Sequence, residues 1–346
     1  MSANFLPNTS LATVAESKSG IYTYAQNYYG DILEIQGKLA GNPEIYTRTG
    51  NVTTIGPTSD DLPPKRFTPL AAIATRDWNT STNRRYVFYV DGQNKLCDAY
   101  YDSKWHKGDL FGKGWVAAPY SRLAAIRLTN RVGADFICLY YQDTADSGDI
   151  KQVSYSHSGW ATGPPPINDP PLFGTSLAAV VPEAGIKSAS STDDVEPVVF
   201  FQYDKLGLGS SQDLGDEDYV TYAIQSHGRA LSAHASIAAV DDGTNLWAFY
   251  TSDDNNVQRI RVDSSGKVHQ PSPVALSIPP IPASPLTAVI FKESPEKVIL
   301  VYLLHWTPDT KSTETTNAYA TTLTRSSTAD GDADSWGVSS QVRLTR

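Results

Sequence analysis

The chain has 346 residues, of which 40% are hydrophobic and 19% charged, and its formal net charge is −9 with a pI near 5.1. This acidic balance argues against nucleic acid or an anionic membrane surface as a partner, and no apolar run approaches the ~20 residues of a transmembrane helix. The 19 Tyr, 10 Phe and 7 Trp, against 1 Met, favour β structure.

One short apolar motif recurs along the chain and is followed each time by a second apolar strand rich in aromatic residues. In chain order its copies are Leu11–Val14, Leu70–Ile73, Leu123–Ile126, Leu177–Val180, Ile237–Val240 and Leu286–Val289. A turn and a third strand come next, and Gly114-Trp115, Gly159-Trp160 and Ser335-Trp336 mark fourth strands. Four short strands per unit of about 50 residues are typical of a propeller blade.

The six copies predict an all-β fold, a six-bladed β-propeller of four-stranded antiparallel blades that forms a single domain over residues 1–346. The small Ala residues suit innermost strands, where the blades crowd together. We expect the N-terminal segment to close the ring by pairing with the last strand near Val338–Leu344, because closure removes open sheet edges. A β-sandwich with accidental repeats is the alternative.

The polar residues show none of the motifs that hold metals, nucleotides or covalent intermediates. The 6 histidines lack zinc-binding spacing, and Asp330–Asp334 lacks the glycine and glutamate of a calcium loop. No dinucleotide fingerprint and no G-x-S-x-G motif is present. The sequence therefore predicts no metal and no cofactor.

Two cysteines and three glycosylation sequons bear on the cellular compartment. Cys97 and Cys138 either form one bridge or remain free thiols, and the sequence leaves both open. The sequons begin at Asn8, Asn51 and Asn79. We expect a protein of the secretory pathway or the extracellular space whose leader has been removed, with a cytoplasmic protein as the alternative.

The second to fourth strands of the third repeat resemble the fungal fucose-specific lectins, which are six-bladed propellers. The likeness rests on Leu139–Asp143, Asp149–Tyr155 and Ser158–Trp160 followed by Gly163. It implies a fucose site between blades, with an Arg on the second strand, a Glu on the third strand and an aromatic wall.

Arginine is missing from every position where this resemblance implies it. The Arg positions hold Ile21, Tyr86, Cys138, Val198, Trp247 and Ile299, and four acid positions hold Glu34, Asp98, Gln152 and Arg259. A lost hydrogen bond to a charged group costs about 1.5–3 kcal/mol. We therefore predict that all six fucose sites are lost.

A lectin scaffold without its sugar residues is similar to the fungal hetero-Diels–Alderases of tropolone–sesquiterpene biosynthesis. This resemblance implies a pericyclase of meroterpenoid biosynthesis, acting on small molecules without a cofactor. It would aid dehydration to a tropolone-derived o-quinone methide and add that to a cyclic, humulene-type terpene, forming a dihydropyran. A carbohydrate-binding propeller with non-fucose specificity is the first alternative, and a non-catalytic interaction propeller is the second.

The cycloaddition would need a site at one mouth of the central channel, on the face built from blade-to-blade loops and loops between second and third strands. Candidates for carbonyl binding and proton transfer are Arg66, Arg122, His234 and His305. Candidates for an aromatic, substrate-binding wall are Tyr28, Phe67, Tyr120, Phe173 and Trp306. Solvated surface groups, and rings packed under their own loops, are the alternatives. The oligomeric state stays open, with a homodimer as one alternative.

Overall fold

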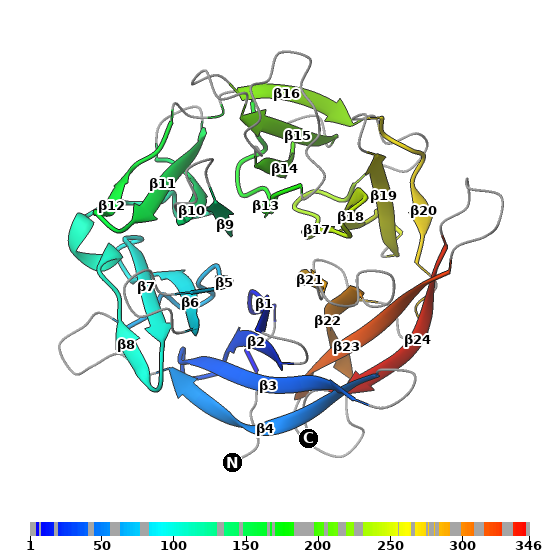
Figure 1. The fold of residues 1–346 in the computed structure, drawn as a ribbon, viewed down its shortest axis with the longest axis horizontal. Coiled ribbons are helices and arrows are strands. Elements are labelled where there is room, and N and C mark those ends of the chain that lie inside the picture. Colours follow the sequence, from blue (N-terminus) through cyan, green and yellow to red (C-terminus); the bar gives the residue numbers. More distant parts are fainter. Residues whose placement is uncertain are drawn as a thin grey trace.

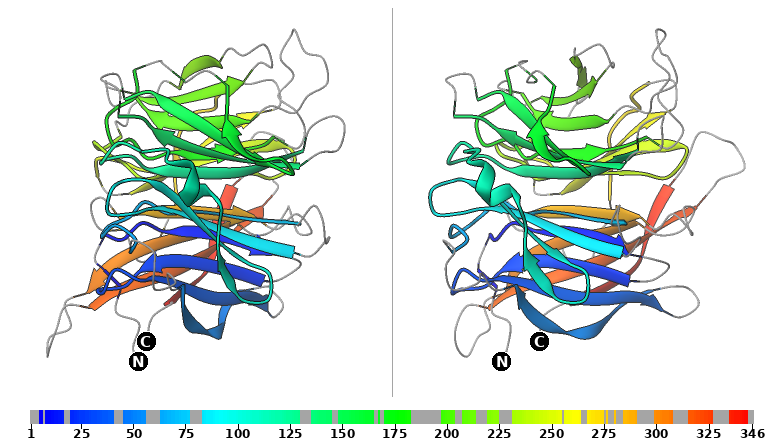
Figure 2. Two further views of the ribbon diagram at one scale, coloured as in Figure 1. Left: turned by 90° about the vertical axis from the view of Figure 1, so that its left-hand side faces the viewer. Right: turned by 60° about the vertical axis from the view of Figure 1, so that its left-hand side comes forward.

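The structure is a computed structural model of the chain. It describes residues 5–6, 8–16, 20–40, 45–55, 63–76, 83–129, 135–144, 148–164, 167, 170–182, 197–203, 207–213, 219–224, 231–254, 256–263, 267–274, 276, 280, 284–290, 299–307, 315–326 and 335–343. Six four-stranded antiparallel sheets form a ring around a central axis (Figure 1), and Figure 2 shows the same ring from the side. The predicted six-bladed β-propeller is confirmed.

Each blade consists of four strands that are consecutive in the chain, with the first strand innermost. The innermost strands are β1 (Ala12–Glu16), β5 (Ala71–Arg76), β9 (Leu123–Thr129), β13 (Ala178–Val180), β17 (Ile237–Asp241) and β21 (Leu286–Ile290). The second strands are β2 (Gly20–Gln26), β6 (Asn83–Val90), β10 (Asp135–Gln142), β14 (Val198–Gln202), β18 (Asn245–Thr251) and β22 (Ile299–Thr307). The third strands are β3 (Ile32–Ala40), β7 (Leu96–Tyr101), β11 (Ile150–Ser156), β15 (Leu208–Asp213), β19 (Val257–Asp263) and β23 (Thr315–Ser326). The fourth strands are β4 (Ile45–Ile55), β8 (Trp105–Lys107), β12 (Gly159–Thr162), β16 (Tyr219–Ile224), β20 (Ser272–Pro273) and β24 (Ser335–Arg343).

The recurring Leu-Ala-Ala-Ile motif forms the innermost strands, as predicted. In five blades its first Ala lies opposite a large ring of the second strand, in the pairs Ala12↔Tyr24, Ala71↔Phe88, Ala124↔Tyr140, Ala178↔Phe200 and Ala238↔Phe249. A small residue near the axis and a large ring further out fill the wedge-shaped space between blades at interior packing density.

The hydrophobic core lies between neighbouring blades. Five buried clusters each combine side chains of two adjacent blades within the described part of the chain. Since successive side chains of a strand point to opposite faces, blades two to five each contribute to the clusters on both of their sides. We call the space between blades one and two the first gap, and the space between blades two and three the second gap.

The prediction for ring closure is wrong. The last strand β24 pairs with β23, and β1 pairs with β2, so each blade keeps its own four strands. Phe5 forms an isolated bridge to Asn27, at the end of β2. Blades one and six instead meet by packing, with β1 beside β21 and β4 beside β24. Complete four-stranded sheets at both ends make strand exchange unnecessary.

The Gly-Trp marks are confirmed in two blades and wrong in one. Gly159 opens β12 and Ser335 opens β24. In blade two the fourth strand is β8 instead, and a short 3-10 helix, η1 (Leu110–Lys113), follows it. Gly114 ends that helix with φ 76, and the Trp115 carbonyl then accepts a hydrogen bond from the Leu96 backbone.

Buried glutamines fix the turns at one end of the channel. Gln26, Gln142 and Gln202 each end a second strand and are 0% exposed. In all three, the side-chain amide donates to carbonyls of the following blade-to-blade turn, and its oxygen accepts a backbone N–H from that turn. One buried side chain thus holds the start of the next blade in place.

A hydroxyl group in these turns also binds the second strand of the blade that follows the turn. Thr9, Thr68, Ser121 and Thr175 accept hydrogen bonds from backbone N–H groups of Gln26, Val90, Gln142 and Gln202 at 2.6–2.9 Å. The residue just before the hydroxyl often has a left-handed backbone, as for Asn8 (φ 55), Phe67 (φ 60) and Gly174 (φ 76). His234 (φ 59) has the same place in the turn before β17. Two of these residues, Asn8 and His234, line a cavity at the mouth of the channel.

Candidate functional site

The register of the strands fixes the residue that stands at each predicted arginine position. Tyr140 lies opposite Gln152, and Cys138 precedes Tyr140 by two residues on the same face. In blade one Tyr24 lies opposite Glu34, so the equivalent residue is Tyr22 and not Ile21. In blade six Tyr302 lies opposite Ala320, so the equivalent is Leu300 and not Ile299. With these two corrections, the family's arginine position holds Tyr22, Tyr86, Cys138, Val198, Trp247 and Leu300.

An arginine nevertheless occupies the first gap, and it comes from the opposite blade. Arg85 of β6 is 4% exposed. Its Nε donates to Glu34 Oε2 at 3.2 Å, and its Nη1 donates to Glu16 Oε2 at 2.5 Å. Its guanidinium carbon lies 3.7 Å from the ring centre of Tyr22 and 4.2 Å from that of Tyr101. The guanidinium is therefore covered on both faces and held by two carboxylates.

The ionisation behaviour of this cluster follows from burial and proximity. Burial opposes the charge of Arg85, but Tyr24, Glu34 and Glu16 raise the pKa of its guanidinium above the ordinary value. Burial also raises the pKa of the Glu34 carboxyl, although Arg85 and a 2.9 Å hydrogen bond from the Tyr24 hydroxyl pull it down. This cluster closes the first gap from within.

The second gap contains a group of aromatic side chains that are only half-buried at the outer edge. Tyr86 packs against Tyr100 of the same blade at 5.7 Å and against Tyr155 of blade three at 6.3 Å between ring centres. Trp160 lies 5.1 Å from Tyr155. His106 stacks on Tyr100 at 4.9 Å with an interplanar angle of 14°. Rings from both blades thus line this gap.

A cation and a carboxyl group accompany these rings. The guanidinium carbon of Arg84 lies 4.7 Å from the ring centre of Tyr100, and Arg84 hydrogen-bonds the Tyr86 hydroxyl. Asp98 is at the acid position and is 2% exposed. Burial raises the pKa of its carboxyl to about 7, although the Leu110 backbone N–H donates to Oδ1 at 2.9 Å. The second gap combines aromatic, cationic and titratable groups.

Glycines make room for the acid-position side chains. The backbone N–H of Gly108 donates to the Asp98 carbonyl, and that of Gly163 donates to the Gln152 carbonyl. A Cβ at Gly108 would lie 2.0 Å from the Asp98 carboxylate, and one at Gly163 would lie 2.9 Å from Gln152. The close approach of the chain after the fourth strand therefore requires glycine in both blades.

The remaining gaps hold no comparable group among the described residues. Gln152 donates to Ser154 at 2.8 Å and to the Cys138 sulfur at 3.4 Å. Arg259 donates to Ser272 at 2.7 Å, and its guanidinium carbon lies 6.0 Å from the Trp247 ring centre. Both arrangements are buried and satisfied internally.

Both cysteines are buried free thiols, so the bridge between them does not form. Cys97 belongs to the cluster of blades one and two, whereas Cys138 belongs to that of blades three and four. Burial raises the pKa of the Cys97 thiol to about 12. A thiol that stays protonated is a poor nucleophile.

The predicted channel-mouth residues lie on one face, but only some of them meet. Tyr120 and Phe173 pack together at 5.4 Å between ring centres. Beside them, His234 Nδ1 lies 3.3 Å from the Gly174 carbonyl oxygen. Arg66 lies over its neighbour Phe67 at 5.8 Å. Tyr28 is 37% exposed in the turn after β2. His305 and Trp306 are strand residues of β22, opposite Asn317 and Thr316, and their side chains are outside the described residues.

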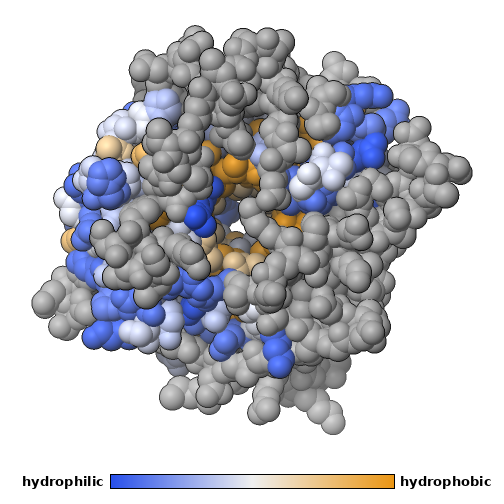
Figure 3. Space-filling model, in the orientation of Figure 1, coloured by the Kyte–Doolittle hydropathy of each residue, from blue (hydrophilic) through white to orange (hydrophobic). Residues whose placement is uncertain are grey.

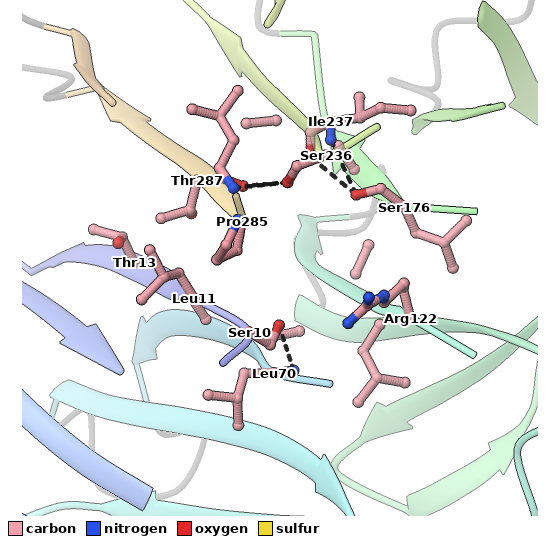
Figure 4. A pocket seen from close by; sticks show the side chains of 18 of the residues that line it. Ser10, Leu11, Thr13, Leu70, Arg122, Ser176, Ser236, Ile237, Pro285 and Thr287 are labelled. Carbon is pink, nitrogen blue, oxygen red and sulfur yellow. Dashed lines mark hydrogen bonds between the residues drawn. The ribbon is translucent and has the colours of Figure 1, made fainter. Parts of the chain in front are cut away.

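Arg122 and His234 line a cavity at the mouth of the channel. Its volume is about 160 Å³, and residues of all six innermost strands contribute to its wall. Figure 3 shows hydrophobic residues around the central opening, and Figure 4 shows the Arg122 side chain projecting into the cavity. Two of the four predicted catalytic residues are therefore brought to one cavity, and the role of all nine predicted site residues stays a prediction.

Sequence reasoning missed Arg84, Arg85 and the aromatic group of the second gap. The signal was the Arg-Arg pair at the start of β6, because neighbouring strand residues point to opposite faces. One arginine therefore had to enter each gap that flanks blade two. The family's arginine position is a different one, so the resemblance did not indicate Arg84 or Arg85.

No group of three or more His, Cys, Asp or Glu residues that could hold a metal ion occurs within the ranges that the structure describes. No helix in those same ranges is long and apolar enough to cross a membrane.

The family model of the fungal fucose-specific lectins matches residues 5–307. The chain belongs to this family. It is 27% identical over 195 residues to the fucose-specific lectin of Aspergillus fumigatus, an alignment that spans 53% of this chain and 57% of that relative.

Solved structures of lectins share the fold. A mutant of the Aleuria aurantia lectin in complex with Fucα1-6GlcNAc has 17% identity and a TM-score of 0.70, over 98% of this chain and 97% of that one. A triple arginine mutant of AofleA from Arthrobotrys oligospora has 14% identity and a TM-score of 0.70, over 99% and 90%. The BP39L lectin from Burkholderia pseudomallei has 14% identity and a TM-score of 0.61, over 99% and 100%.

Proposed function

We propose that this protein is a carbohydrate-binding, lectin-like propeller whose sugar specificity differs from fucose, and that its sugar site is the second gap. The observation that carries this proposal is the half-buried group of Tyr100, Tyr155, Arg84 and His106 at that gap. Membership of a lectin family supports sugar binding in general. The loss of arginine from the family position in all six blades supports a change of specificity.

The chemistry of the second gap suits a sugar. An aromatic face covers the apolar C–H side of a pyranose ring, while a guanidinium donates charge-assisted hydrogen bonds to its hydroxyl groups. Tyr100 and Tyr155 supply such faces, and Arg84 lies beside one of them. In the first gap, by contrast, both faces of Arg85 are already covered by tyrosines.

A glycan array followed by calorimetry with the best sugars tests this proposal. We expect binding of one or more non-fucose glycans, weak or no binding of methyl fucoside, and an affinity loss of about two- to tenfold in Tyr100→Ala, since aromatic contacts are worth roughly 0.5–1.5 kcal/mol. Tyr29→Ala is the matched control, because Tyr29 is 92% exposed on a turn outside the gap. An array without hits would exclude the proposal.

A second candidate function is the hetero-Diels–Alder cycloaddition of a tropolone-derived quinone methide and a humulene-type terpene. One observation favours it: Arg122 and His234, two residues predicted for carbonyl binding and proton transfer, line the same cavity. Its volume of about 160 Å³ is close to the ~150 Å³ of an apolar cavity that holds benzene. Such a space accommodates one ring, which counts against two substrates held together.

Incubation of the protein with a hydroxymethyl tropolone and humulene tests the second candidate. A pericyclase forms the dihydropyran faster and more selectively than buffer does, and Arg122→Gln lowers that rate. Equal rates with and without protein would remove this function and leave the sugar-binding proposal untouched.

A further inference from the structure

The mouth of the central channel carries a repeated position that differs between blades. The residue just before each innermost strand, or before its leading Leu, is Ser10, Pro69, Arg122, Ser176, Ser236 or Pro285. All of these except Pro69 are among the lining residues of the 160 Å³ cavity. The six positions form a ring around the channel, so they are directly comparable.

The serines of this ring fasten one blade to the next. Ser10 accepts a hydrogen bond from the Leu70 backbone at 3.1 Å, Ser176 from Ile237 at 3.0 Å and Ser236 from Leu286 at 2.7 Å. We call each of these hydrogen bonds between neighbouring blades a serine clasp, and Figure 4 shows them around the cavity. Blade three has Arg122 at the equivalent place, and the structure gives Arg122 no such clasp. The arginine replaces an interaction that stabilises three other junctions.

The guanidinium of Arg122 has no partner among the residues that the structure describes. The Arg122 carbonyl accepts a hydrogen bond from the Ser121 hydroxyl, but the side chain makes no hydrogen bond, ion pair or ring contact within the ranges that the structure describes. No aspartate or glutamate is among the described residues that line the cavity. Arg85 and Arg259, in contrast, donate to carboxylates or to a hydroxyl. In a chain with a net charge of −9, this is a local excess of positive charge.

The surroundings of Arg122 make its charge available to a ligand. Its side chain is exposed to the channel, while the enclosing walls lower the pKa of the guanidinium from its ordinary value. Arginine still remains protonated at every physiological pH. The wall of the cavity includes an alanine from each innermost strand, and His234 contributes an imidazole.

We propose that the channel mouth binds a small organic carboxylate with a body of about one six-membered ring, held by Arg122. A guanidinium presents paired N–H donors that match the two oxygens of a carboxylate. One permanent cation, with no second one among the described residues that line the cavity, suits a monoanion better than a multiply charged ion, and the volume of about 160 Å³ limits its body to about one ring. The site is distinct from the second gap and does not depend on the proposed lectin function.

Titration with benzoate, followed by calorimetry and ligand-observed NMR, tests this inference on the full chain. Benzoate is expected to bind and benzamide, its neutral isostere, to bind at least about tenfold more weakly, since hydrogen bonds between charged groups are worth roughly 1.5–3 kcal/mol. Inorganic phosphate is expected to bind more weakly than benzoate. Raising the salt concentration should weaken benzoate binding by screening.

Arg122→Ser is the decisive variant because it recreates the serine clasp found at three other junctions. It should melt at a temperature no lower than the parent protein and lose benzoate affinity by at least about tenfold. Arg66→Gln is the matched control, since Arg66 lies on the same face and does not line the cavity. The inference is overturned if the parent protein does not bind benzoate, if phosphate or benzamide binds as tightly, if Arg122→Ser binds benzoate undiminished, or if Arg66→Gln loses as much affinity.

Discussion

The first and second gaps flank the same blade and receive consecutive arginines, yet they differ in what remains accessible. Arg85 enters the first gap, where two carboxylates and two tyrosine rings surround it. Arg84 enters the second gap and lies half-buried beside Tyr100. The Arg85 guanidinium is buried, whereas Arg84 is only half-buried. A charge therefore marks a binding site only where its partners leave it exposed.

The family resemblance makes this contrast informative. A guanidinium and a carboxylate in an interblade gap are the groups that the lectin resemblance implies, and the first gap contains both as Arg85 and Glu34. They come from opposite blades and bind each other. A sugar entering this gap would have to break a buried ion pair, which leaves uncompensated charges in a low-dielectric space.

The largest expected effect comes from removing the cation of the first gap. Arg85→Ala leaves Glu34 and Glu16 without their shared partner, and breaking a buried pair on one side costs about 3–5 kcal/mol. Urea denaturation at pH 7 measures this loss. The triple variant Arg85→Met, Glu34→Gln and Glu16→Gln should recover much of it. If Arg85→Ala costs no more than Arg84→Ala, the two gaps do not differ as described.

The second prediction concerns pH and the carboxyl group of the second gap. The pKa of Asp98 is raised to about 7 in the folded protein, so between pH 4 and pH 7 the folded state keeps a proton that the unfolded state releases. Ionisation of Asp98 therefore lowers stability as the pH rises through this range, by at most about 4 kcal/mol.

Asp98→Asn isolates that contribution, because an amide oxygen can still accept the Leu110 N–H. The free energy of unfolding of this variant, minus that of the parent, should increase from pH 4 to pH 7 and then level off. Asp109→Asn removes an exposed negative charge that contributes to the raised pKa of Asp98, so this variant should lose less stability than the parent between pH 4 and pH 7. A flat difference for Asp98→Asn would show that this carboxyl is ionised in the folded protein.

The third prediction tests how tightly the second gap is closed behind Asp98. Gly108→Ala would place a methyl group 2.0 Å from the carboxylate and should destabilise the fold by about 1–3 kcal/mol. Gly112→Ala is the matched control, since no atom lies within 4 Å of its added Cβ. Thermal unfolding of the two variants should separate them clearly. Equal melting temperatures would mean that the chain around Gly108 adjusts freely.

The fold was predictable because its signal is repeated. In each Leu-Ala-Ala copy, small residues form an inner strand that lies opposite large aromatic rings of the second strand. Because this pattern is repeated, one irregular copy does not hide it. Ring closure failed as a prediction because it depends on only two segments of the chain. A single pairing has no internal repeat to confirm it.

The sites were harder to predict because they depend on contacts between blades. The pairing of Arg85 with Glu34 joins residues 51 positions apart, and only the three-dimensional ring brings them together. The absence of arginine at the family position was visible in the sequence, whereas the approach of an arginine from the facing blade was not. The turn before β9 made Arg122 a candidate, but only the structure shows that its side chain has no partner among the described residues.

The smallest expected change in stability comes from Arg84→Ala, and this variant distinguishes the second gap from the first most directly. Cation–π contacts at half-exposed sites are worth about 0.5–1 kcal/mol, so urea denaturation should show a loss of that size. The affinity for the best sugar on the array should nevertheless fall about tenfold, because a charge-assisted hydrogen bond of roughly 1.5–3 kcal/mol is lost. Arg85 would show the reverse pattern, with a large loss of stability and no direct contact with the sugar. Should Arg84→Ala bind that sugar unchanged, the second gap would be structural in the same way as the first.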